Sequence, residues 1–261
     1  DDAEIYRMLL GLPEKMTRDD VLAALPDREE LVALLRVPNA ERLPALRQAF
    51  RCGIDLDEIH SLTAIDPWFL ESIRELVEYE QRLPQALTDT RLMREAKQLG
   101  YSDRQIALSS DISPGAVRAI RKSLGVLPTY KLVDTCAAEF AAETPYYYST
   151  WEDEGEIRPS TKARIMILGG GPNRIGQGIE FDYCSVHSAW ALQEGGRKSI
   201  MINSNPETVS TDFDTSDRLY FEALDEESVA DILENETGLH APPAVVQFGG
   251  QTAINLAGPL Y

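Results

Sequence analysis

The ten residues GGGPNRIGQG, at positions 169–178, form a turn that can bind a ligand through its backbone. They follow the apolar residues 165–168 and precede the amphipathic residues 179–192, so the turn is expected to join a strand to a helix. Glycine lets the backbone approach a ligand closely, and a helix N-terminus presents unpaired N–H groups. A tight crossover without any ligand explains the spacing equally well.

Two common phosphate-binding motifs do not fit this turn. A dinucleotide fingerprint that starts at Gly169 needs its last glycine five residues later, where the chain has Arg174. A P-loop that starts at Gly171 does reach Gly176, but Gln177 then stands where the phosphate-binding lysine is required. The turn therefore offers no charged clamp for a triphosphate.

From Ala163 onward, the sequence alternates between strands and helices. Continuous apolar strands separated by helices predict a parallel sheet with right-handed crossovers. The helix after the first strand places four large side chains on one face, namely Ile179, Tyr183, Val186 and Trp190. The expected strands are 164–168, 199–202, 218–221 and 244–248, and the expected helices are 178–192 and 226–236.

Glycines and amides gather at the carboxyl edge of this expected sheet, which is where such sheets bind ligands. Residues 169–178 follow the first strand, 203–207 the second and 249–252 the fourth. A dinucleotide fold would place an acidic residue at the tip of the second strand, where this chain has Asn203. The edge therefore suits a small polar or charged guest, or an interdomain surface, better than an adenosine dinucleotide.

Residues 1–149 show helical periodicity throughout and predict an all-α domain. Asp66 is expected to cap a helix that has Pro67 in its first turn. Residues 144–161 lose this periodicity and predict a connector on the surface. An apolar stripe follows Pro67 and is interpreted as core or helix-packing surface: Trp68, Phe69, Ile73, Leu76 and Val77.

Residues 102–122 resemble a helix-turn-helix, with Arg118, Arg121 and Lys122 on the second helix. This basic cluster is small, and the chain carries a net charge of -18, so neutralisation of DNA phosphates would be weak. A helical hairpin that packs within an all-α domain is the favoured interpretation. The same acidic charge disfavours anionic membranes, and no apolar segment is long enough to span a bilayer, so we expect a cytoplasmic protein.

No metal site or disulfide framework is expected. The three cysteines and three histidines are widely scattered, without a CxxC pair. Asp212, Asp214 and Asp217 lack the spacing of a calcium loop, and we interpret them as turn-forming or capping residues.

Four longer strings resemble one family closely. They are VDTCAAEFAAETPYYYST at 133–150, LGGGPNRIGQGIEFDY at 168–183, NPETVSTDFDTSDRLYF at 205–221 and FGGQT at 248–252. All four are similar to the large chain of carbamoyl phosphate synthase, and IDPWFL at 65–70 resembles a motif of that chain's helical region. The resemblance implies a helical oligomerisation domain at 1–156, with a connector at about 144–161. A Rossmann-like, pre-ATP-grasp α/β subdomain would follow at 162–261, incomplete at its C-terminus.

The resemblance also implies a place within a much longer ligase, which makes carbamoyl phosphate from bicarbonate, ammonia from glutamine, and ATP. The product serves pyrimidine or arginine biosynthesis. The ATP and Mg²⁺ sites would lie beyond Tyr261, so no catalytic residue is expected here and the isolated chain is expected to be inactive. The expected partners are the remaining ATP-grasp and allosteric domains, a glutaminase small chain or domain, and further copies of the chain.

In this family, carbamate moves between active sites through an internal passage, and loops that match Gly178, Glu180 and Glu207 line it. A glycine keeps a passage open, and carboxylates can orient a guest by hydrogen bonding. Two plainer interpretations stay open. In one, the negative charge of Glu180 serves only to stabilise the N-terminus of its helix, and in the other, Glu207 is a solvated loop residue. The other glycines assigned to the strand-end loops are Gly169, Gly170, Gly171, Gly176, Gly249 and Gly250.

Two alternatives belong to other functional classes. A self-contained protein could oligomerise through its helical region and bind a nucleotide at its α/β region, and a tight ATP or NAD site would favour it. DNA binding through residues 102–122 ranks last, and salt-dependent retention on DNA would favour it.

Overall fold

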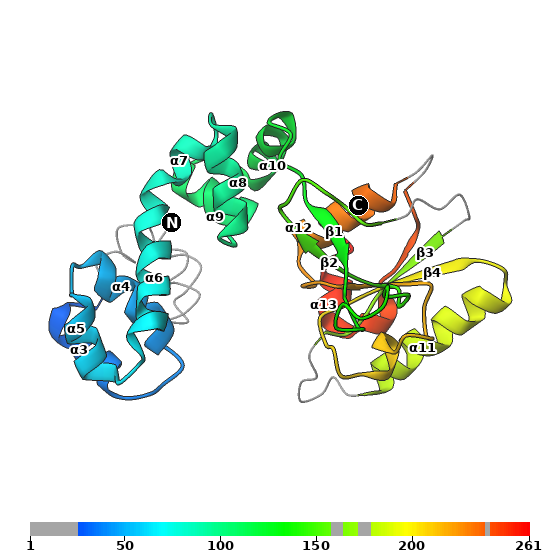
Figure 1. Cartoon of the computed structure of the whole chain (residues 1–261), viewed down its shortest axis with the longest axis horizontal. Helices are drawn as coiled ribbons and strands as arrows, with labels where there is room; N and C mark the ends of the chain where they lie inside the picture. Colours follow the sequence, from blue (N-terminus) through cyan, green and yellow to red (C-terminus); the bar gives the residue numbers. More distant parts are fainter. Residues whose placement is uncertain (1–25, 158–163, 172–178, 238–240) are drawn as a thin grey trace. The chain divides into compact units, whose positions relative to one another are not determined.

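The computed structural model describes residues 26–157, 164–171, 179–237 and 241–261 (Figure 1). The chain divides into two compact units, and the division falls between Val126 and Leu127. The first unit is helical and the second is built around a sheet. This order confirms the expected fold class, an all-α part followed by an α/β part.

Most α-helices described in the first unit begin at a side-chain cap, although α4 and α7 do not. Asp27 and Glu30 form a capping box at the start of α3. Asp66 accepts a hydrogen bond of 2.9 Å from the backbone N–H of Trp68, and Pro67 is the first residue of α6, as the sequence predicts. The elements are α3 Arg28–Arg36, α4 Arg42–Arg51, α5 Leu56–Thr63, α6 Pro67–Tyr79, η1 Glu80–Arg82, α7 Leu83–Ala86, α8 Thr90–Gln98, α9 Asp103–Ser110 and α10 Pro114–Ser123.

The apolar stripe expected on α6 is only partly buried. Val77 of the stripe is buried, and it shares a face with the buried Leu70, which the stripe did not include. Trp68 is 69% exposed and Phe69 is 57% exposed, so the interpretation as core is wrong for these two residues. Trp68 lies about 200° around the helix from Leu70, which turns its ring away from the core of α3 to α6. The two rings pack edge to face, with centroids 4.9 Å apart.

The helix-turn-helix resemblance corresponds to two real helices, α9 and α10, that pack against each other. Arg121 is fully buried, and its Nε and Nη2 donate to Asp103 at 3.0 and 2.9 Å. Lys97 of α8 lies 3.3 Å from the same carboxylate. One of the three basic residues is therefore an internal ion-pair partner and not a phosphate contact, which supports the helical hairpin.

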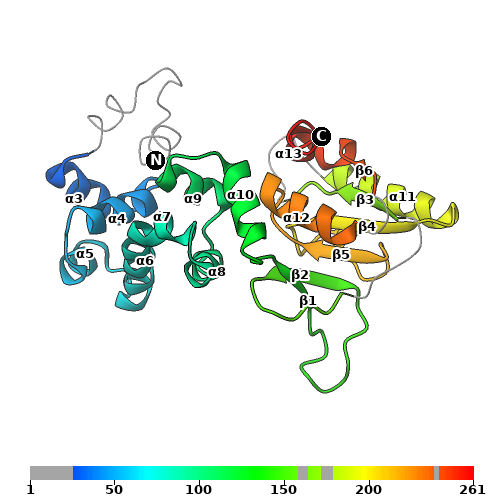
Figure 2. The ribbon, with the colours of Figure 1, turned by 90° about the horizontal axis from the view of Figure 1, so that it is seen from above.

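The second unit holds a six-stranded sheet in the order β1-β2-β5-β4-β3-β6 (Figure 2). β1 is antiparallel to β2, and the four remaining pairings are all parallel, as expected. β6 is shorter than expected because a 3-10 turn, η3, replaces its second half. The strands are β1 Thr129–Leu132, β2 Tyr146–Thr150, β3 Arg164–Leu168, β4 Lys198–Asn203, β5 Arg218–Phe221 and β6 Ala244–Val245.

The expectation of helix up to residue 149, and of a surface connector from 144, is wrong where β1 and β2 form. Both strands are rich in tyrosine, which packs well on a pleated surface. Tyr130 is 2% exposed and meets Tyr220 edge to face at 5.2 Å, and Tyr147 packs on the same ring at 5.9 Å. Burial against β5, which is distant in sequence, decides the structure of this segment.

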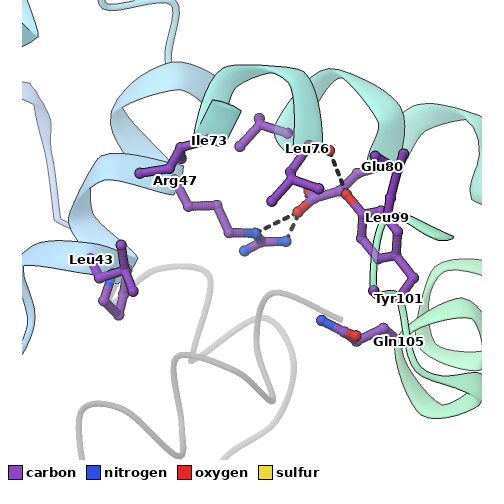
Figure 3. A pocket seen from close by; sticks show the side chains of 11 residues that line it. Leu43, Arg47, Ile73, Leu76, Glu80, Leu99, Tyr101 and Gln105 are labelled. Carbon is purple, nitrogen blue, oxygen red and sulfur yellow. Dashed lines mark hydrogen bonds and ion pairs between the residues drawn. The ribbon is translucent and has the colours of Figure 1, made fainter. Parts of the chain in front are cut away.

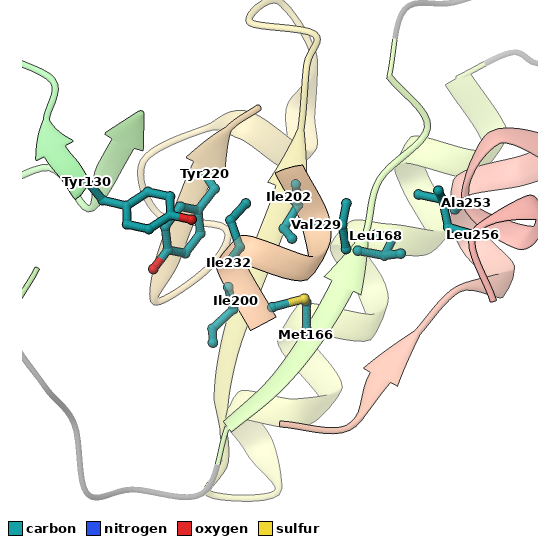
Figure 4. Close-up of a cluster of buried hydrophobic side chains, with 10 residues drawn as sticks. All are labelled: Tyr130, Met166, Leu168, Ile200, Ile202, Tyr220, Val229, Ile232, Ala253 and Leu256. Carbon is teal, nitrogen blue, oxygen red and sulfur yellow. The ribbon is translucent and has the colours of Figure 1, made fainter. Parts of the chain in front are cut away.

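Side chains alternate between two cores, one on each face of the sheet. Met166 and Leu168 face the core that α12 and α13 cover, shown in Figure 4. Ile167, with Met201 and Leu219, faces the core that Ala189 of α11 completes. The elements outside the strands are α11 Ile179–Glu194, η2 Val209–Thr211, α12 Glu226–Glu236, η3 Gln247–Gly249 and α13 Gly250–Asn255.

The face of α11 that carries the large side chains is mostly not the buried one. Val186 is buried, but Ile179, Tyr183 and Trp190 are 64%, 63% and 45% exposed. Apart from Val186, the buried positions of α11 are small or polar, namely Asp182, Ser185 and Ala189. Small residues let the helix approach the sheet closely, so the large ones lie outside.

A buried carboxylate joins the amino ends of two strands to the end of α12. Glu236 forms ion pairs with Arg164 of β3 and Arg218 of β5 and accepts from the Tyr220 hydroxyl at 2.5 Å. Burial raises the pKa of the Tyr220 phenol, and the nearby Glu236 carboxylate raises it further. This ionic cluster ties β3 and β5 to the end of α12, at the opposite end of the strands from the glycine-rich loops.

Candidate functional site

The carboxyl ends of β3, β4 and β5 meet at one edge of the sheet, because these strands are parallel. The backbone N–H of Gly169 donates to the Ile202 carbonyl at 2.8 Å and extends the β3–β4 ladder by one residue. Asn203 ends β4 and is 1% exposed. The polar edge therefore begins directly where the buried core ends.

The loop that follows β3 packs against the loop that follows β6, and glycines form the contact. A Cβ on Gly249 would lie 2.5 Å from the Gly169 carbonyl oxygen and 2.3 Å from the Ala253 Cβ. A Cβ on Gly169 would lie 2.7 Å from Nδ2 of Asn203. Side-chain atoms do not fit at either position, so both glycines serve close internal packing. This supports the interpretation of the turn as a tight crossover.

Two other glycines adopt backbone conformations that side chains rarely take. Gly171 has φ +64°, and a Cβ there would lie 3.1 Å from the Ser204 hydroxyl. Gly250 has φ 63° and ψ -155° at the start of α13. A Cβ added at Gly170 would lie 3.9 Å from the Gly249 carbonyl oxygen, so residues 169–171 approach both the loop after β4 and the loop after β6. Gly176 and Gly178 lie outside the described residues.

The two carboxylates assigned to the passage both lie at this edge and are exposed. Glu180 is in the first turn of α11, where a negative charge favours the helix N-terminus. Glu207 follows β4, and its backbone N–H donates to Oδ1 of Asn205 at 3.0 Å. Either side chain can meet a guest from solvent, so the passage and the plainer interpretations both fit their positions.

Sequence reasoning missed two acidic residues near this edge. Asp182, inside the string that resembles the family, is 6% exposed and accepts from the Ser210 backbone N–H at 3.0 Å. Glu222 directly follows β5 and accepts from the Ser149 backbone N–H at 2.5 Å. The position of Glu222 directly after a strand was an available signal, whereas the burial of Asp182 depends on Ser210, 28 residues away in the sequence.

Burial raises the pKa of Glu222, although the Ser149 hydrogen bond opposes the shift. A raised pKa means that the fold prefers the protonated carboxyl, so this contribution to stability is lost as the pH rises through the raised pKa. Glu222→Gln keeps an acceptor for Ser149 and cannot ionise. We expect the variant to lose less stability than the wild type between pH 4.5 and 7. Urea denaturation across this pH range measures the difference.

The control for this prediction is Glu194→Gln, at an exposed position near the end of α11. It should follow the wild-type pH dependence. A Glu222→Gln curve parallel to that of the wild type would contradict the assignment.

Of the three aspartates after β4, Asp217 has a structural role. Asp217 accepts from the Ser199 backbone N–H at 2.9 Å and pairs with Lys198, while Asp212 and Asp214 are exposed. Within the described residues, no three His, Cys, Asp or Glu side chains are grouped so that they could hold a metal ion. Nor is any described helix both long and apolar enough to cross a membrane.

The helical unit holds a separate cavity of about 470 Å³ (Figure 3). Its charged groups pair with each other, since Arg47 donates to both oxygens of Glu80, at 2.6 and 2.9 Å. The Tyr101 hydroxyl donates to the Leu76 carbonyl at 2.5 Å. The rest of the lining is largely apolar. This arrangement gives no specific polar contact that would assign a ligand to the cavity.

Comparison with known families assigns both units. Residues 10–125 match the oligomerisation domain of the carbamoyl-phosphate synthetase large chain, and residues 161–261 match the carbamoyl phosphate synthase pre-ATP-grasp domain. The chain belongs to the carbamoyl phosphate synthase large-chain family. The first range agrees with the helical unit, and the second covers β3 to β6 but not β1 and β2.

Curated relatives of this family cover nearly the whole chain. Carbamoyl phosphate synthase large chains from Nostoc sp. and Synechocystis sp. are each 55% identical, over 244 and 240 residues, or 92% and 90% of this chain. The large chain from Archaeoglobus fulgidus is 52% identical over 239 residues, or 89%. The chain spans only 22% of the length of each of these relatives.

Proposed function

We propose that this chain is a segment of an ATP-dependent ligase that makes carbamoyl phosphate from bicarbonate, glutamine-derived ammonia and ATP. The carrying observation is the 55% identity over 92% of the chain to a carbamoyl phosphate synthase large chain. Identity at this level extends through both units, so it supports a shared role for each. The product would enter pyrimidine or arginine biosynthesis, and the enzyme would act in the cytoplasm.

The chemistry itself is proposed to reside outside residues 1–261. Phosphoryl transfer needs cationic groups on the phosphates and carboxylate-held Mg²⁺. The loops at 203–207 and 249–252 carry no lysine or arginine, and Arg174 of the loop after β3 lies outside the described residues. ATP and Mg²⁺ would therefore bind in ATP-grasp domains elsewhere in the protein. We expect the isolated chain to form no carbamoyl phosphate.

The helical unit would contribute to assembly, and the sheet edge to a carbamate passage. The family description of residues 10–125 supports a homo-oligomer. The passage is supported by the exposure of Glu180 and Glu207 beside loops of small residues. Other proposed partners are the remaining ATP-grasp and allosteric domains and a glutaminase small chain or domain.

Gly178→Phe in the full-length enzyme tests the passage. A phenyl ring would obstruct a channel that only glycine leaves open. We expect carbamoyl phosphate formed per ATP hydrolysed to fall on the order of tenfold, because obstructed carbamate decomposes after the first phosphorylation. The measurement compares product formation with ATP hydrolysis in the same assay.

The matched control is Gly258→Ala, at an exposed glycine with no heavy atom within 4 Å of an added Cβ. This variant should keep the wild-type ratio. If Gly178→Phe forms as much carbamoyl phosphate per ATP hydrolysed as the wild type, the passage assignment is wrong. Carbamoyl phosphate formation by the isolated chain would contradict its proposed inactivity.

A further inference from the structure

A chain of hydrogen bonds begins in the first turns of α11 and passes beneath the loop that follows β4. Oδ2 of Asp182 accepts from the Ser210 backbone N–H at 3.0 Å, and the Ser210 hydroxyl accepts from Nδ2 of Asn203 at 3.0 Å. These three residues are 6%, 0% and 1% exposed. Bonds this deeply buried are shielded from competing water, so they hold the helix, η2 and the end of β4 together.

The same network continues outward to the sheet edge. Oδ1 of Asn203 accepts from the Asn205 backbone N–H at 3.0 Å, and Oδ1 of Asn205 accepts from the Glu207 backbone N–H at 3.0 Å. The network thus ends at the backbone of an exposed carboxylate. Its other end, Asp182, lies two residues after Glu180 on α11. It therefore joins the two elements that carry Glu180 and Glu207.

The space for this network depends on a glycine of the neighbouring loop. An added Cβ at Gly169 would lie 2.7 Å from Nδ2 and 3.0 Å from Cγ of Asn203. A side chain at this position would push the Asn203 amide away from Ser210. The glycine-rich turn and the loop after β4 are therefore fitted to each other through the Asn203 amide.

Asp182 is more polar than its place in the fold requires. Its second oxygen, Oδ1, is buried and has no hydrogen-bond partner among the described residues. A buried carboxylate with one unsatisfied oxygen costs stability, and a neutral amide would accept the same Ser210 hydrogen bond. What Asp182 supplies to the loop is the acceptor Oδ2 for the Ser210 backbone N–H, which ties η2 to α11.

We propose that Asp182, Asn203 and Asn205 are positioning residues that fix Glu207 relative to Glu180 in the carbamate passage. This inference rests on the passage assigned under the proposed function. Asn203 and Ser210 transmit the position of α11 to the loop, and Asn205 sets the backbone at Glu207. None of the three positioning residues needs to touch the guest. Small displacements of orienting groups reduce transfer strongly, which makes such a network useful.

The test uses the full-length enzyme with its glutaminase partner and two variants of one loop residue. Asn205→Ala removes the acceptor for the Glu207 N–H, while Asn205→Asp keeps an oxygen at the same position. We expect carbamoyl phosphate per ATP hydrolysed to fall on the order of tenfold in Asn205→Ala and to recover in Asn205→Asp. The melting temperature is measured alongside, because a merely structural role would lower it without changing the ratio.

Asp182→Ala tests the remote end of the network. We expect carbamoyl phosphate formed per ATP hydrolysed to fall as much in Asp182→Ala as in Asn205→Ala. Asp182→Asn should stay close to the wild type, because the amide oxygen still accepts from the Ser210 backbone N–H. Asp214→Ala, at an exposed position on the same segment, is the matched control and should change nothing. If Asp182→Ala fails to fold, the Asn205 pair decides, since that side chain is partly exposed.

Glu207→Ala separates this inference from the proposed function. If Glu207→Ala forms as much carbamoyl phosphate per ATP hydrolysed as the wild type, Glu207 does not serve a passage. That result would overturn both the passage role of Glu207 and the positioning network. A lowered ratio in Glu207→Ala with normal ratios in Asn205→Ala and Asp182→Ala would overturn the positioning network alone. Lowered ratios in all three, with recovery in Asn205→Asp, are the result that we expect.

Discussion

Replacing Gly249 with alanine is expected to destabilise the α/β unit by at least about 3 kcal/mol, at the upper end for overpacked positions. The new Cβ would lie 2.3 Å from the Ala253 Cβ and 2.5 Å from the carbonyl oxygens of Leu168 and Gly169. Carbon atoms pack at about 3.5–4.0 Å, so the end of β3 or the start of α13 must move. Urea denaturation of the 261-residue chain measures the loss.

Two further variants test the cause of this loss. Adding Ala253→Gly removes one of the three close contacts and should restore only part of the stability, because both carbonyl contacts remain. Gly258→Ala is the matched glycine control and should be close to neutral. Wild-type stability in Gly249→Ala would show that the two loops do not pack as closely as described.

Arg121→Ala is expected to destabilise the helical unit by about 3 kcal/mol, because it leaves the buried Asp103 carboxylate without its closest partner. Arg121 donates to both oxygens of Asp103 and, from Nη1, to the Val126 carbonyl at 3.2 Å. The loss should not be larger, since Lys97 still lies 3.3 Å from that carboxylate. Thermal and urea unfolding followed by helical circular dichroism measure it.

The control for this prediction breaks an exposed ion pair instead. Arg28→Ala removes the 2.7 Å contact to Glu58, where both side chains are partly exposed, and should change stability far less. Arg121→Met combined with Asp103→Leu and Lys97→Met removes all three charges of the cluster and should recover much of the loss. Equal effects of Arg121→Ala and Arg28→Ala would contradict the buried network.

Much of the fold follows from sequence pattern, because apolar runs and caps act locally. Residues 164–168 and 218–221 form strands with the expected bounds, and α12 spans the expected 226–236. Asp66 and Pro67 start α6 as predicted. The convergence of three loops was also predictable, since parallel strands place their carboxyl ends at one edge.

Other features depend on contacts between residues distant in sequence. Helical periodicity around Tyr130 gave no sign that its ring would pack on Tyr220 and draw β1 into the sheet. Exposure of Trp68 and Trp190 was likewise hidden, because periodicity shows that a helix has an apolar face but not whether that face meets the core. Asp182 accepts its hydrogen bond from Ser210, which lies 28 residues away on another element, so its burial had no local signal.

The most direct test of the central claim is the mass of the protein that carries this sequence in its source cells. An antibody against the chain, combined with an assay for ATP-dependent carbamoyl phosphate formation, links mass to activity. The account predicts a species several times heavier than 29.1 kDa that co-fractionates with the activity, since the chain spans 22% of its relatives. A species of 29.1 kDa, without carbamoyl phosphate formation in its fractions, would contradict the account.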